Sequence, residues 1–106
     1  MEINKKAKEF AYYVKNTEEF KYMNKCKQDL ERNRSLKNQL NSYINKKNSI
    51  YSTYRMEDAT RKVNTLNQEY ENFFNMPLVS NYMDATRQFN SMMERLYKLI
   101  EQEMLK

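Results

Sequence analysis

The chain contains no glycine and only one proline, Pro77, in its 106 residues. Glycine supplies the positive-φ positions that tight turns, β-hairpins and phosphate-binding loops require. A Walker loop, a dinucleotide-binding fingerprint and a nucleophile elbow are therefore excluded, and a β fold with many turns is disfavoured. Histidine is also absent, which removes the commonest general base and metal ligand. These absences favour long helices joined by short polar breaks, and an interaction protein rather than an enzyme.

A length of 106 residues predicts a single domain over residues 1–106. Hydrophobic residues make up 40% of the chain, but nine tyrosines and eight methionines supply much of that fraction. Because branched aliphatic residues are sparse, a lone monomer is expected to have a thin core. Self-association would relieve this deficit.

The net charge of +5 is unevenly distributed. Residues 1–55 carry 13 Lys and Arg against 6 Asp and Glu, a net +7, whereas residues 56–106 carry 6 against 8, a net −2. A basic N-terminal half can bind RNA, an acidic protein surface or an anionic membrane surface. Dispersed lysines are equally typical of a solvated helix surface, and this is the simpler interpretation.

The basic residues alternate with tyrosines, which is the composition of surfaces that bind phosphates and stack on bases. The basic members are Lys5, Lys6, Lys8, Lys25, Lys27, Arg32, Arg34, Lys37, Lys46 and Lys47, and the tyrosines are Tyr12, Tyr13, Tyr22, Tyr43, Tyr51 and Tyr54. No recognisable RNA-binding module is present. Direct nucleic-acid binding through the basic N-terminal half is therefore kept as the alternative function.

Apolar spacing predicts four helices. The first covers residues 3–15, and Asn16 with Glu19 forms a capping-box pattern that starts the second. The second is one long helix from Thr17 to about residue 55, with a kink at Arg32–Asn33, where Asn33 can interrupt or re-cap it. The third opens at Glu57 and continues to residue 75. The predicted fold is an all-α antiparallel bundle with two long helices.

The fourth helix runs from Pro77, an N1 proline, to about Met104. At 1.5 Å per residue it is roughly 40 Å long, which exceeds a typical small domain. Part of its apolar seam is therefore expected to face another chain. The candidate interface residues are Tyr82, Phe89, Met92, Met93, Leu96, Leu99 and Ile100.

The remaining reactive groups do not form a recognisable site. The chain offers no second cysteine and no histidine that could join Cys26 in a redox or metal site. Because Cys26 occupies an apolar position of its helix, it is interpreted as a packing residue. The paired carboxylates lie mostly at helix ends, where the helix dipole explains them. No catalytic residue, metal site or cofactor is expected.

The single cysteine fits a reducing compartment. The N-terminus has no apolar signal-peptide core, and no apolar run approaches the ~20 residues of a membrane span. A cytoplasmic location without membrane insertion is expected.

The order of these elements resembles the YlbF/YmcA family of small helical bacterial proteins. The segment from Asn75 to Tyr82, followed by Ala85, is similar to the N-x-P-L-V-x-x-Y-x-x-A opening of the family's last helix. Residues 7–20 are similar to its entry motif, and Leu30-Glu31-Arg32-Asn33 with Leu36, Leu40 and Tyr43 to its L-x-x-D-x-x-A-x-x-L-x-x-F stretch. In the last of these motifs, Asn33 stands where the family usually has an aspartate, and both residue types cap helices.

The resemblance implies a regulatory protein that forms homodimers or hetero-oligomers with sister family members. It links the chain to a complex that modulates RNase Y and so mRNA processing, competence, biofilm formation and sporulation. Some members bind an iron–sulfur cluster through cysteines, including ones near the C-terminus. This chain has no cysteine near Leu105-Lys106, so no cluster is expected.

Overall fold

The computed structural model describes residues 1–106, and 89% of them are helical with no strands. The helices are α1 (Glu2–Lys15), α2 (Glu18–Glu31), α3 (Arg34–Thr53), α4 (Met56–Glu69), α5 (Glu71–Phe74) and α6 (Pro77–Met104). The all-α class is confirmed. The predicted number of about four helices is wrong, and packing of all the helices into one bundle stays a prediction.

Two breaks account for the extra helices. Asn33 starts a new helix rather than kinking an old one: its backbone is extended, and its side-chain oxygen accepts a hydrogen bond from the Leu36 N–H at 3.2 Å. Tyr70 separates α4 from α5. The apolar spacing does not reveal this second break, because Tyr70, Phe73 and Phe74 would share a face in an unbroken helix as well.

The cap at the start of α2 is Thr17, so its assignment to Asn16 was wrong by one residue. Thr17 Oγ1 accepts from the Phe20 N–H at 3.2 Å, which is the geometry of an N-cap. Asn16 instead ends α1, where its side-chain amide donates to the Tyr12 carbonyl at 2.7 Å. Both residue types can cap, and only the backbone geometry decides between them.

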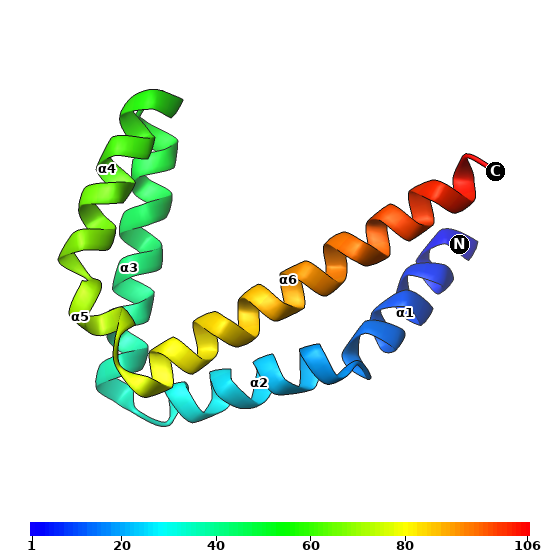
Figure 1. The fold of residues 1–106 in the computed structure, drawn as a ribbon, viewed down its shortest axis with the longest axis horizontal. Coiled ribbons are helices and arrows are strands. Elements are labelled where there is room, and N and C mark those ends of the chain that lie inside the picture. Colours follow the sequence, from blue (N-terminus) through cyan, green and yellow to red (C-terminus); the bar gives the residue numbers. More distant parts are fainter. The chain divides into compact units, whose positions relative to one another are not determined.

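The chain divides into two compact units, with the boundaries inside α2 and α6. Unit 1 comprises residues 1–28 and 81–106, and unit 2 comprises residues 29–80. Within unit 1, α6 runs antiparallel to α2 and α1, which meet at a bend (Figure 1). Within unit 2, α3 and α4 form an antiparallel hairpin that turns at Tyr54–Arg55, and α5 follows α4.

The hairpin of unit 2 is held by an aromatic cluster around Tyr43. The Tyr43 ring lies 4.9 Å from the Phe74 ring and 5.3 Å from the Tyr70 ring, centroid to centroid. Its hydroxyl donates to Asn67 Oδ1 across the hairpin at 2.5 Å. The buried side chains of this unit are Leu30, Leu36, Leu40, Tyr43, Ala59, Val63, Leu66, Phe73 and Val79.

The side-chain cap of α3 can be tested with Asn33→Ala. Losing the bond to the Leu36 N–H should lower the free energy of unfolding by about 1 kcal/mol, measured by urea denaturation. Asn38→Ala is the matched control, because Asn38 is exposed in the interior of the same helix and alanine is the better helix former there. An unchanged Asn33→Ala midpoint would show that the cap contributes nothing.

The bond across the hairpin can be tested with Tyr43→Phe, which keeps the ring and removes the hydroxyl. We expect a loss of about 1 kcal/mol of stability, whereas Tyr51→Phe, at an exposed ring, should change little. If both variants are equally stable, the Tyr43–Asn67 bond adds no net stability.

Tyr43→Phe should also change how the stability of the protein depends on pH under alkaline conditions. Burial, and secondarily the nearby Tyr51, raise the pKa of Tyr43 above its ordinary value of about 10. The folded state therefore holds this proton more tightly than the unfolded chain, so stability is full below about pH 10 and falls as pH rises above it. Thermal unfolding of Tyr43→Phe should show a shallower fall than the parent chain.

Candidate partner-binding face

The seven candidate interface residues all lie on α6 in unit 1, and the structure separates them into two groups. Met92 is buried, and Tyr82, Phe89, Met93 and Leu96 are half-buried. Leu99 and Ile100 are exposed, with 58% and 39% of their surfaces accessible. The seam is thus partly used inside the unit and is open only towards the C-terminus.

The internal part of the seam meets α2. The Phe20 and Phe89 rings pack edge to face with centroids 5.9 Å apart, a favoured geometry for aromatic pairs. Arg95 and Glu19 lie 3.8 Å apart at the surface, where an ion pair adds little stability. A charge at Phe89 would therefore disturb the unit itself before it disturbed any assembly.

Cys26 is buried in unit 1, which agrees with its interpretation as a packing residue. A side-chain hydrogen bond with Cys26 raises the pKa of the Tyr22 hydroxyl, and the charges of Cys26 and Asp84 act in the same direction. No group of three or more His, Cys, Asp or Glu side chains in residues 1–106 is arranged to hold a metal ion.

The core of unit 1 is small. Its buried side chains are Val14, Cys26, Ala85 and Met92. Many of its large apolar side chains are instead exposed towards the ends of α1 and α6, among them Ile3, Tyr12, Tyr13, Tyr97, Leu99, Ile100, Met104 and Leu105. An exposed apolar patch of this kind marks an interaction site more often than a plain surface.

Four of these side chains, Tyr13 of α1 and Leu99, Ile100 and Met104 of α6, line two hollows that share Leu99, and together they are here called the terminal strip. Leu99, Ile100 and Met104 line a hollow of about 370 Å³ together with Glu103. A second hollow of about 160 Å³ lies next to it, lined by Tyr13, Met92, Arg95, Leu96 and Leu99. The surface of the terminal strip is therefore uneven and apolar, which is typical of surfaces against which a partner's side chains pack.

The candidate interface predicted from the sequence includes Leu99 and Ile100 of this strip, but neither Met104 of α6 nor Tyr13 of α1. Tyr13 was grouped with the basic and aromatic residues, because its neighbours are lysines and tyrosines. Met104 stands at the predicted end of the fourth helix, outside the candidate interface, and it is 72% exposed. A pattern within one helix cannot show which part of the stripe a neighbouring helix covers.

The lysine and tyrosine residues of unit 2 are also brought together. Lys46 Nζ lies 5.2 Å from the Tyr70 ring centroid, Lys47 Nζ 5.9 Å from the Tyr43 centroid, and Lys62 Nζ 4.6 Å from the Tyr54 centroid. Each contact is a cation–π pair, worth about 0.5–1 kcal/mol at an exposed site.

None of the six helices is both long and apolar enough to cross a membrane. No curated protein and no solved structure matches the chain. The family model described as "Control of competence regulator ComK, YlbF/YmcA" matches residues 3–104, which include nearly all of both units. That description gives the family a regulatory role. The chain therefore belongs to the YlbF/YmcA family.

Proposed function

We propose that the protein is a non-enzymatic, cytoplasmic regulatory adaptor that binds other helical proteins through the terminal strip. The observation that supports this most strongly is the imbalance in unit 1: only four side chains are buried while Leu99, Ile100 and Met104 remain exposed on one face. An apolar face of this kind gains stability when a partner removes it from water, at about 25 cal/mol per Å² buried.

The partner is proposed to present an apolar helix face of its own. Residues 96, 99, 100, 103 and 104 follow the spacing of one face of α6, and Tyr13 borders them on α1. A helix laid against such a face is a common recognition mode among helical proteins. A second copy of this chain and a sister family member both carry suitable faces, so a homodimer and a hetero-oligomer are the two assemblies proposed.

The regulatory role of the family supports the direction of this proposal. The link to RNase Y and to mRNA processing rests on the resemblance alone. In this scheme the protein reaches the RNA-processing machinery through its sister proteins rather than by contacting RNA itself.

The alternative is a direct nucleic-acid-binding module that uses the basic N-terminal half. It is favoured by the three lysines that lie over tyrosine rings in unit 2. Phosphate-driven binding weakens by orders of magnitude between low and moderate salt, because bound counterions are released. An apolar helical interface does not respond to salt in that way.

Association through the terminal strip can be tested with Leu99→Glu and Ile100→Glu. A charge buried at an apolar interface should weaken self-association about tenfold or more, measured by sedimentation velocity. Gln88→Glu is the matched control, since it adds the same charge at an exposed α6 position outside the strip. Circular dichroism should show the same helix content for all three variants. A parent chain that is monomeric at high micromolar concentration would contradict the homodimer.

Partner identity can be tested by affinity purification from the native cells, with and without nuclease. Recovery of sister family proteins in both samples supports the adaptor, and their loss from the Leu99→Glu sample assigns them to the terminal strip. Loss of every partner after nuclease treatment would instead favour the nucleic-acid-binding alternative.

A further inference from the structure

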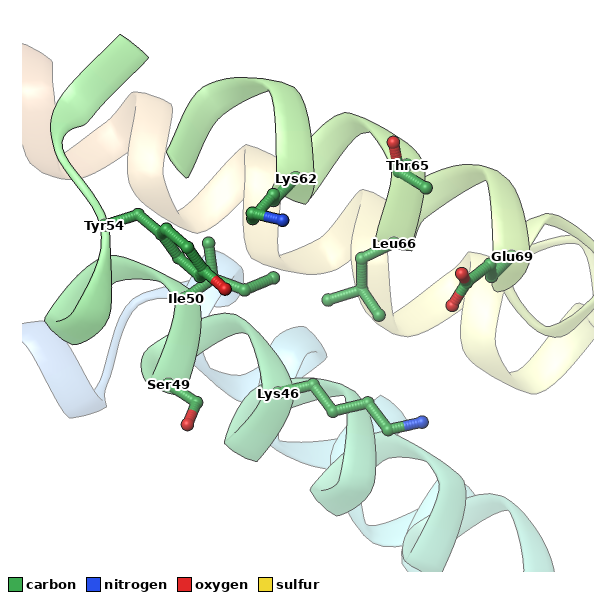
Figure 2. A pocket seen from close by; sticks show the side chains of 8 residues that line it. All are labelled: Lys46, Ser49, Ile50, Tyr54, Lys62, Thr65, Leu66 and Glu69. Carbon is green, nitrogen blue, oxygen red and sulfur yellow. The ribbon is translucent and has the colours of Figure 1, made fainter. Parts of the chain in front are cut away.

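A hollow of about 430 Å³ lies on the α3/α4 hairpin of unit 2, and none of its lining residues belongs to the terminal strip. It is lined by Lys46, Ser49, Ile50, Tyr54, Lys62, Thr65, Leu66 and Glu69. Ile50 and Leu66 lie between the two helices, with the lysines on either side (Figure 2). Its volume is within the range of sites that hold small molecules.

The register of the hairpin places the α-carbons of the two lysines at the same level, although their ammonium groups extend to different tyrosines, that of Lys46 to Tyr70 and that of Lys62 to Tyr54. Lys46 is eight residues before Tyr54 on α3, and Lys62 is seven residues after Arg55 on α4. At 1.5 Å per residue, both α-carbons lie about 11 Å from the turn. The two side chains therefore start at the same level of the hairpin, one from each helix.

Both ammonium groups are uncompensated by carboxylates. None of the ion pairs in the structure includes Lys46 or Lys62, although Glu69 lines the same hollow. Lys46 Nζ instead donates to the Tyr70 hydroxyl at 3.1 Å, and Lys62 Nζ lies over the Tyr54 ring. These contacts are weak enough for an anion to displace, because a charge-assisted hydrogen bond is the stronger interaction.

A phosphate monoester is the anion that matches this charge. It carries −1.5 to −2 at neutral pH, which two lysines can neutralise, and its oxygens can also accept from the hydroxyls at the rim. When Lys62 moves to the anion, it uncovers the face of the Tyr54 ring. A flat heterocycle can stack on that face, as bases do on tyrosines in nucleotide-binding proteins.

We propose that this hollow binds a nucleoside 5′-monophosphate, with the phosphate between Lys46 and Lys62 and the base on Tyr54. The site is separate from the proposed partner-binding face, so either can fail without the other. Glu69 lies seven residues beyond Lys62 on α4 and opposes anions entering the hollow. Removing the Glu69 carboxylate should therefore strengthen ligand binding, whereas removing either lysine should weaken it.

The test is a titration of the full chain with adenosine 5′-monophosphate, followed by the backbone amide NMR shifts of residues that line the hollow. Saturable shifts at Ile50, Tyr54 and Leu66 are expected at millimolar ligand. Adenosine and inorganic phosphate should each bind at least about tenfold more weakly, since each provides only one of the two contacts. Equal binding of inorganic phosphate, or the absence of saturable shifts, would overturn the proposal.

Four variants separate a defined site from general attraction of anions. Lys46→Gln and Lys62→Gln should each weaken binding about tenfold, and Glu69→Gln should strengthen it about twofold. Lys47→Gln is the matched control, because it removes the same charge from the neighbouring position of α3 outside the hollow. An equal loss in Lys47→Gln would mean that only net charge matters and would overturn the assignment.

Discussion

Every helix end in this protein is made without a left-handed residue. No residue has a positive φ, so the glycine C-cap that closes many helices is not used. Asn16, Tyr70 and Asn75 end their helices with ψ near 0°, and Tyr54 ends α3 in an extended conformation. New helices then begin within a few residues, at Thr17 and Asn33 with a side-chain cap. The fold is organised by these breaks, because only one or two residues separate consecutive helices.

The two units use their apolar residues differently. Unit 2 closes its hairpin over branched aliphatic residues and the Tyr43 cluster, and its polar contact between Tyr43 and Asn67 joins residues 24 apart in the sequence. Unit 1 has one aromatic pair, Phe20 and Phe89, and few fully buried side chains. This difference is the physical basis for assigning partner binding to unit 1, since stability that is missing inside can be gained at an interface.

The same difference separates the two proposed sites chemically. The terminal strip is apolar and suits another helix. The hollow of unit 2 combines two uncompensated lysines with a tyrosine ring and suits a small anion (Figure 2). Of the lysines and tyrosines that suggested nucleic-acid binding, only Lys46 and Tyr54 line this hollow, and the others lie elsewhere along the chain.

The sequence by itself determined the all-α class, the family, and the limits of α6 from Pro77 to Met104, because missing glycines, helical spacing and an N1 proline act locally. It could not determine the break at Tyr70, because the 3.6-residue spacing continues through it. Nor could it divide the α6 seam into Phe89, which packs on Phe20, and Leu99, which stays exposed. Spacing reports which residues share a face of one helix, whereas burial depends on the helix that lies opposite. That Lys46 and Lys62 line one hollow was likewise decided only by the register of the hairpin.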